Sequence, residues 1–123
     1  MKNKTIDLVT YTGKSQRVLS GRDKGEAMRK KLKLDELEKQ FDNIEIEVRE
    51  FINVINSSYF LGLFEDSILE MGEDRFRKKY KFKCSDPIKV NVENGIRYAL
   101  LSQTNVLGGK KGWKKWLENS LLD

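Results

Sequence analysis

Residues 44–71 read I-E-I-E-V-R-E-F-I-N-V-I-N-S-S-Y-F-L-G-L-F-E-D-S-I-L-E-M, and the spacing of apolar residues changes within this stretch. Ile44, Ile46 and Val48 alternate with charged residues, which is the pattern of a strand with one buried and one solvent-exposed face. Farther on, apolar positions recur every three to four residues, as they do on one face of a helix. The residues of this helix face are Phe60, Leu63, Phe64, Ser67, Ile68 and Met71.

This change of period predicts a central strand that leads into a helix. Phe60, Phe64 and Ile68 are expected to pack on the sheet. Ser57 or Ser58 is the expected N-cap, because a serine hydroxyl accepts hydrogen bonds from the free N–H groups of a helix's first turn. The opposite face of the predicted helix is formed by Gly62, Glu65, Asp66 and Glu70.

Two further elements are predicted on the N-terminal side. Residues 5–11 alternate and are rich in β-branched side chains, which indicates a first strand. Residues 22–40 place apolar side chains at helical spacing among many charges, which indicates a helix. The phase of this stripe slips near Leu34, so two interpretations stay open. The helix is continuous, or it breaks ahead of Asp35, which would then cap a second short helix.

On the C-terminal side, residues 75–79 are predicted to form a basic connector and residues 80–84 another strand, with Cys84 pointing inward. Residues 85–101 fit either a helix capped by Ser85 or a hairpin that turns at Asn94 and Gly95. The helix is favoured by an apolar stripe at helical spacing: Ile88, Val92, Ile96, Ala99 and Leu100.

The last segment is predicted to be an amphipathic helix over residues 110–122. Trp113, Trp116, Leu117 and Leu121 share one face of it, and four lysines lie on the other. Gly108 and Gly109 separate this segment from the rest of the chain. We therefore divide the chain into a domain over residues 1–107 and a helical extension over residues 108–123.

The order strand, helix, strand, helix, strand, helix predicts an α/β fold. Such an order is typical of a small parallel or mixed sheet flanked by helices, because parallel strands need crossover connections. The 123 residues suffice for one domain. No apolar run is long enough to span a membrane or to form a secretory leader, so we expect a cytoplasmic protein.

The composition argues against an enzyme. The chain has no histidine and one cysteine, which removes the usual general base, the usual metal ligand and every Ser-His or Cys-His pair. We therefore predict no catalytic residue, no metal site and no cofactor. The formal net charge of +5 is spread widely and is weaker than the dense basic stripe of a dedicated nucleic-acid reader.

Over residues 17–101 the chain resembles STAS-like domains, a small family of unknown function related to anti-sigma-factor antagonists. Three stretches carry the resemblance: S-G-R-D-K-G-E-A-M-R-K-K-L from residue 20, I-E-I-E-V-R-E-F from residue 44, and I-N-S-S-Y-F-L-G-L-F from residue 55. In the broader STAS pattern, the third stretch has an acidic residue, a phosphorylatable serine, another serine and a glycine. Here Asn56 replaces the acid, Ser57 and Ser58 match, and Tyr59 replaces the glycine.

The resemblance implies a non-enzymatic regulatory module that binds a protein partner, such as a histidine-kinase-like ATPase. Asn56, Ser57, Ser58 and Tyr59 are the implied phosphorylation or partner-binding residues. Independently of the resemblance, a phosphate at a helix N-terminus is favoured by free N–H groups and the positive end of the helix dipole. The plainer interpretation is that the serines only cap the helix.

Two other clusters are candidate binding sites. Gly21, Arg22 and Gly25 could form an anion-binding helix entrance. The alternative function is that of a small basic nucleic-acid-associated protein, in which lysines hold the backbone and tryptophans stack on bases. Residues 75–83 would add charge to it. The candidate nucleic-acid residues are Lys110, Lys111, Trp113, Lys114, Lys115 and Trp116.

Overall fold

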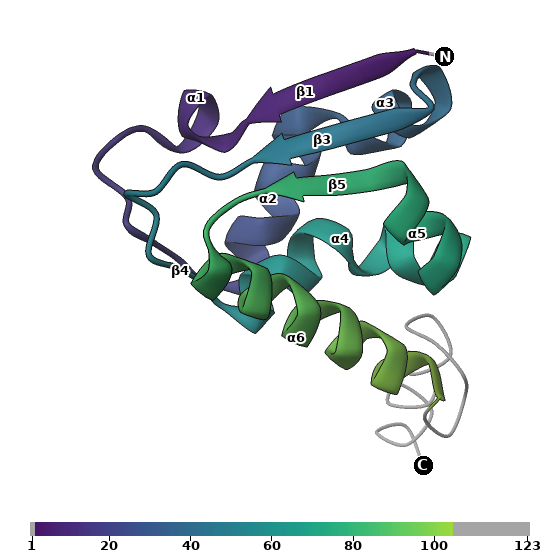
Figure 1. Cartoon of the computed structure of the whole chain (residues 1–123). Coiled ribbons are helices and arrows are strands. Elements are labelled where there is room, and N and C mark those ends of the chain that lie inside the picture. The colour runs from purple at the N-terminus through teal and green to yellow at the C-terminus, as the bar shows by residue number, and fades with distance from the viewer. Residues whose placement is uncertain (1, 105–123) are drawn as a thin grey trace.

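A three-stranded parallel sheet forms one layer of the molecule, and three long helices form the other (Figure 1). The computed structural model describes residues 2–104 and the side chains of residues 2–102. The strands are β1 (Asn3–Asp7), β3 (Asn43–Glu47) and β5 (Tyr80–Lys83), in the order β1-β3-β5. The helices are α2 (Arg22–Leu32), α4 (Ser57–Met71) and α6 (Asp86–Thr104). The predicted α/β fold is confirmed, and β3 is central as predicted.

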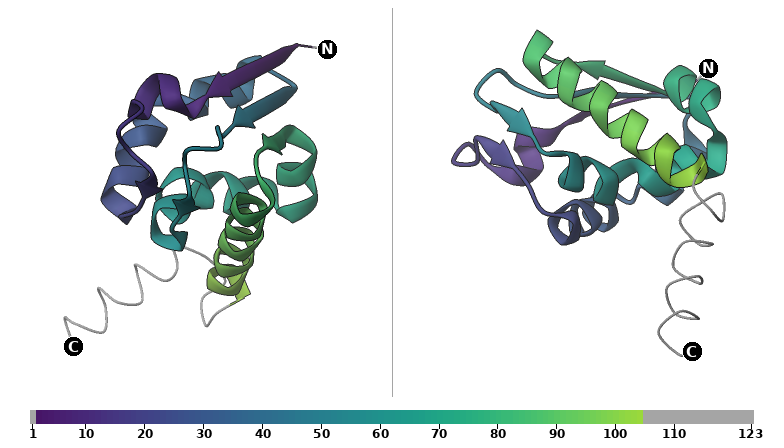
Figure 2. Two further views of the ribbon diagram at one scale, coloured as in Figure 1. Left: turned by 60° about the vertical axis from the view of Figure 1, so that its left-hand side comes forward. Right: turned by 90° about the horizontal axis from the view of Figure 1, so that it is seen from below.

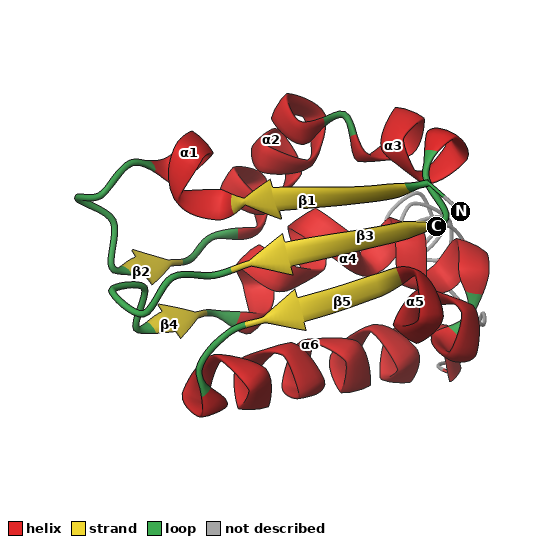
Figure 3. Ribbon diagram, turned by 45° about the horizontal axis from the view of Figure 1, so that its top comes forward, coloured by secondary structure: helices red, strands yellow, loops and turns green. Residues whose placement is uncertain are grey.

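The two faces of the sheet differ as the alternation predicts. Ile44 and Ile46 of β3 are fully buried on the helix side. On the other face, Glu45 is in register with Lys81, and Glu47 with Lys83. Opposite charges on neighbouring strands stabilise a solvated face. Figure 3 shows the three arrows pointing the same way, with α2, α4 and α6 starting near their carboxyl ends.

A second, two-stranded parallel sheet precedes two of the helices. It consists of β2 (Val18–Leu19) and β4 (Val54–Ile55). Leu19 and Ile55 are buried, and β4 is tied to α6 because the Ile55 amide donates to the Asn91 side chain at 2.9 Å. β2 leads into α2 and β4 leads into α4, so their pairing brings the starts of these helices together (Figure 2).

The first predicted strand is wrong in its second half. The strand ends at Asp7, and α1 (Leu8–Thr12) follows. The Asp7 carboxylate accepts a hydrogen bond from the Val9 amide at 3.1 Å and thereby caps this short helix. A local capping bond therefore overrides the β propensity of the sequence.

The predicted long helix is broken. Lys33 adopts a left-handed conformation (φ 56°) between α2 and α3 (Leu34–Gln40). The continuous helix over residues 22–40 is thus wrong, and the alternative of a break ahead of Asp35 is confirmed, although Asp35 is not the cap of the second helix. Asp35 lies in the first turn of α3 and accepts a hydrogen bond from Arg29 at 2.7 Å.

The predicted basic connector is also wrong, because residues Glu73–Lys79 form the helix α5. It begins after Gly72, whose φ of 84° favours glycine, and it buries Phe76 completely. The favoured helix over residues 85–101 is confirmed by α6, and the hairpin alternative is wrong. None of the described helices has the length and apolar character needed to cross a bilayer. The predicted C-terminal helix and domain boundary lie outside the described residues.

Candidate partner-binding site at two helix N-termini

α2 and α4 pack so closely that their backbones touch. A Cβ atom on Gly62 would overlap the Arg22 carbonyl oxygen and lie 2.8 Å from the Glu26 amide nitrogen. A Cβ atom on Gly25 would likewise overlap the carbonyl oxygen of Tyr59. Each helix therefore places a glycine against the backbone of the other. Gly62, assigned from the sequence to the face opposite the core stripe, is buried at this contact.

The close packing joins the two helix N-termini through one serine. The Gly21 amide, at the N-cap of α2, donates to Ser58 Oγ at 3.3 Å. Ser58 Oγ in turn donates to Asn56 Oδ1 at 3.0 Å. The positive ends of both helix dipoles therefore lie at one place. The structure thus brings together two sets of candidate residues that are far apart in the sequence.

The N-cap of α4 is Asn56, so the prediction of a serine cap is wrong. Asn56 has extended dihedral angles, and its Oδ1 accepts a hydrogen bond from the Ser58 amide at 3.0 Å. Asparagine is as favourable an N-cap as serine, so propensity alone could not decide between Asn56 and the two serines that follow it. Both serines are consequently inside the first turn of α4.

The two serines differ in what their hydroxyls do. Ser58 uses its hydroxyl within the protein, as donor and as acceptor. Ser57 is half-buried at the first position of α4, and its hydroxyl makes no hydrogen bond to residues 2–102. Ser57 is therefore the serine whose hydroxyl stays available for modification or for contact with a partner.

The remaining candidates of the two sets have structural partners. The Arg22 guanidinium forms an ion pair with the buried Glu65. Gly25 N–H donates to the Gly21 carbonyl at 3.0 Å, one turn inside α2. Tyr59 is buried, and burial raises its pKa to about 12, which keeps the phenol protonated. Asn56 is exposed and Gly21 and Ser57 are half-buried, so these three candidates can contribute to a surface.

Two exposed valines lie next to these residues and were missed by the sequence interpretation. Val18 and Val54 are in register on β2 and β4, and they expose 55% and 39% of their surface. The motifs V-L and V-I are too short for alternation to mark them as strands. We call Val18, Gly21, Val54, Asn56 and Ser57 the junction surface.

Asn56→Ala is expected to lower the free energy of unfolding by about 0.5–2 kcal/mol, the usual cost of removing an N-cap. The Ser58 amide and Ser58 hydroxyl would both lose their acceptor. Urea denaturation followed by circular dichroism measures the loss. The matched control is Asn53→Ala, because Asn53 is exposed and uses its backbone rather than its side chain. Equal effects of both changes would contradict the capping role.

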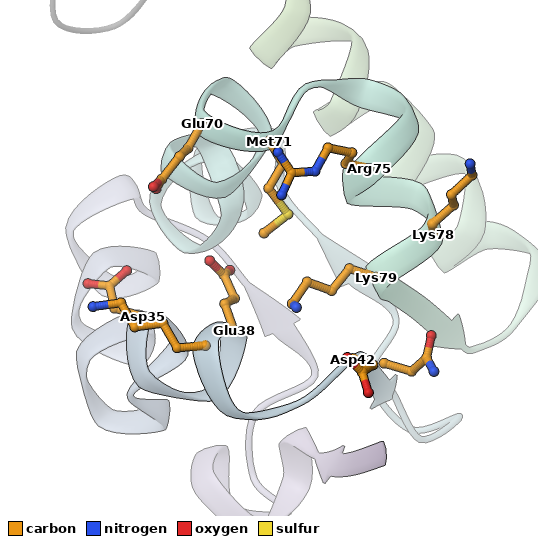
Figure 4. Close-up of a pocket in the computed structure, with 10 residues that line it drawn as sticks. Asp35, Glu38, Asp42, Glu70, Met71, Arg75, Lys78 and Lys79 are labelled. Carbon is orange, nitrogen blue, oxygen red and sulfur yellow. The ribbon is translucent and has the colours of Figure 1, made fainter. Parts of the chain in front are cut away.

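A cleft of about 990 Å³ lies at the far end of α4, and both acidic and basic side chains line it (Figure 4). Asp35, Glu38, Lys39 and Asp42 line it from α3 and the residues that follow, and Glu70, Arg75, Lys78 and Lys79 line it from α4 and α5, so each side carries both charges. Glu38 is held by the hydroxyls of Ser67 and Tyr80, the latter at 2.5 Å, and burial together with Glu38 raises the pKa of Tyr80. The Glu38 carboxylate therefore completes a hydrogen-bond network inside the protein.

The candidate nucleic-acid residues Lys110 to Trp116 lie outside the described residues. Two cations of the basic run 75–83 have partners in the protein: Arg77 binds both Glu93 oxygens at 2.9 Å, and Lys79 donates to the Phe41 carbonyl at 2.7 Å. The Arg77 side chain lowers the pKa of Glu93 through these bonds.

Comparisons of the chain with models of protein families, with curated proteins and with solved structures find no match.

Proposed function

We propose that this protein is a non-enzymatic regulatory module that binds a protein partner through the junction surface. The observation that carries the proposal is that two adjacent serines use their hydroxyls differently. Ser58 ties the two helices together, whereas Ser57 keeps a free hydroxyl at the same helix end. The hydrogen bonds of Ser58 explain why a serine stands at position 58. No hydrogen bond to residues 2–102 explains the serine at position 57, so Ser57 is the candidate for a functional role.

The surroundings of Ser57 fit a phosphorylation switch. A phosphate adds about −1.5 to −2 charges, and helix N-termini stabilise such charge. With α2 and α4 starting side by side, both dipoles would act on a phosphate at Ser57. The change of charge beside the exposed Val18 and Val54 would alter a docking surface without unfolding the domain.

The resemblance to STAS-like domains supports the same function and names a class of partner. In that interpretation a histidine-kinase-like ATPase, or another switching partner, binds the junction surface and is released or recruited when Ser57 is phosphorylated. The exposed valines offer the apolar contact that such a complex needs at its centre.

Ser57→Asp is expected to change partner binding while leaving the free energy of unfolding within about 0.5 kcal/mol. Ser58→Asp is expected to cost about 1–2 kcal/mol, because a carboxylate cannot donate the bond that Ser58 gives to Asn56. The partner is first captured from the native host with the wild-type chain, and its affinity for each variant is then measured by calorimetry. Equal destabilisation by both changes, with unaltered affinity of the captured partner, would contradict the proposal.

Two other functions have weaker support. Two of the acids that an enzyme could use in the cleft are already engaged within the protein, because Asp35 is bonded to Arg29, and Glu38 to Ser67 and Tyr80. Nucleic-acid binding would rest on the charges of residues 75–83 and 110–116. An affinity for DNA or RNA that falls steeply with added salt would favour that alternative.

A further inference from the structure

Another cleft, of about 360 Å³, is formed by α1, β2 and α2, and a tyrosine of α4 also lines it. Its volume is within the range of pockets that hold small ligands. The walls combine apolar and basic side chains, and no aspartate or glutamate of residues 2–102 lines it. The lining includes Val18, Lys24, Ala27, Met28, Lys31 and Tyr59.

Tyr59 brings a buried hydroxyl to this cleft. Its ring belongs to the core and the residue is 3% exposed, but the hydroxyl makes no hydrogen bond to residues 2–102. Every fully buried side-chain oxygen or nitrogen in that part of the chain has a partner, so the Tyr59 oxygen must reach the open space of the cleft. A phenol without a partner costs free energy, and an acceptor on a ligand would remove that cost.

α2 contributes a stripe of two lysines with apolar residues between them. Lys24 and Lys31 are two turns apart, roughly 10 Å along the helix, and Ala27 and Met28 lie between them on the same side. The Lys31 ammonium donates to the Tyr11 carbonyl at 3.1 Å. The Lys24 ammonium is exposed and has no partner among residues 2–102.

The position of Lys24 also favours an anion beside it. Lys24 is the third residue of α2, and the positive end of the helix dipole disfavours a cation in the first turn. A negative charge bound next to Lys24 would offset this repulsion. The cleft therefore offers one free cation and one free hydroxyl next to apolar side chains.

We propose that this cleft binds a small monocarboxylic acid with an apolar body. The carboxylate pairs with the Lys24 ammonium and accepts a hydrogen bond from the Tyr59 hydroxyl. The hydrocarbon part lies against Val18, Ala27 and Met28. One cation and one donor match the single charge and the two oxygens of a carboxylate.

Two observations define how the bound acid would relate to the rest of the molecule. Burial raises the pKa of Tyr59 to about 12, so its hydroxyl is protonated and able to donate at neutral pH. Val18 lines the cleft and also belongs to the junction surface. The proposal does not depend on the function of Ser57, because Lys24 and Tyr59 lie outside the junction surface.

Hexanoate is the probe that tests the proposal, and the amide chemical shifts of the isotope-labelled full chain report its binding. We expect saturable shifts centred on residues 18–28 and on Tyr59. Hexanol lacks the charge and acetate lacks the apolar body. Each of these control ligands is expected to bind about ten-fold more weakly than hexanoate, or weaker still.

Tyr59→Phe is expected to weaken hexanoate binding about ten-fold, because it removes a hydrogen bond to a charged group. The urea midpoint should not fall, since this hydroxyl makes no bond within residues 2–102. Tyr98→Phe is the control at an exposed tyrosine. Lys24→Gln should also weaken binding, whereas Lys30→Gln, at an exposed lysine of α2 that does not line this cleft, should not.

Several results would overturn the proposal. They are the absence of saturable shifts, shifts spread over the exposed lysines (adventitious binding only), and equal affinity for hexanoate and hexanol, which would indicate a plain apolar groove. Unchanged affinity of both Tyr59→Phe and Lys24→Gln would place the carboxylate elsewhere. If Tyr59→Phe lowers the urea midpoint, the exposed Lys24 decides, and unchanged affinity of Lys24→Gln then overturns the proposal.

Discussion

Phe64→Ala is expected to lower the free energy of unfolding by about 3–5 kcal/mol, as a buried phenylalanine replaced by alanine does when the cavity cannot collapse. The Phe64 ring is 2% exposed and lies at the centre of an aromatic cluster. Its centroid is 5.1, 5.7, 5.2 and 5.5 Å from those of Phe60, Phe76, Tyr80 and Phe82. Three of these contacts are edge-on, which adds to the gain from burial alone.

The size of the effect follows from the elements that meet at this ring. Phe76 comes from α5, and Tyr80 and Phe82 come from β5, so the cavity would loosen one helix and one strand together. Urea denaturation followed by circular dichroism measures the loss. Phe51→Ala is the matched control, because it removes the same atoms at a half-buried loop position. A loss at Phe64 no greater than at Phe51 would show that the helix face is misassigned.

The elements predicted correctly from the sequence are those with strong local patterns. The alternation of Ile44 and Ile46 and the helical spacing of Phe60, Phe64 and Ile68 each decide the burial of a whole face, and all five side chains are buried. α5 was missed because its buried apolar residue, Phe76, stands alone in a run of charges. A single apolar side chain has no period to detect.

The candidate site was only partly predictable, because its geometry depends on contacts across the chain. The sequence identified Gly21 and Ser57 as separate candidates, but nothing local indicates that residues 21 and 58 share a hydrogen bond. The pairing of β2 with β4 creates that contact, and each of these strands is two residues long. Val18 and Val54 become neighbours for the same reason.

The contact between Gly25 and Gly62 is the clearest case of information that local patterns lack. A glycine inside a predicted helix indicates low helix propensity and gives no sign of a partner. The two glycines are 37 positions apart, yet each is required by the backbone of the opposite helix. Their reciprocal arrangement sets the distance between α2 and α4, and hence the place of Ser58 beside Gly21.

Gly62→Ala is therefore expected to lower the free energy of unfolding, by an amount at or above the upper end of the roughly 1–3 kcal/mol typical of overpacked sites. The added methyl group would meet the backbone of Arg22 and Glu26, which cannot rotate away as a flexible side chain can. The sign of the change in the free energy of unfolding distinguishes a close backbone contact from an exposed helix position. In an exposed helix interior the same change stabilises by about 1 kcal/mol, because alanine is the better helix former.

Urea denaturation of Gly62→Ala measures this loss, with Glu70→Ala as the control for an exposed position on the same helix. Hydrogen exchange at the Gly21 amide gives a second readout. If the methyl group pushes α2 from α4, the bond from Gly21 to Ser58 lengthens and this amide exchanges faster, while that of Ile55, which is held by Asn91 of α6, does not. Unchanged exchange at Gly21 together with a stabilised helix would mean that the two backbones are not in contact. The junction surface would then lack the support that holds Ser57 at the paired helix ends.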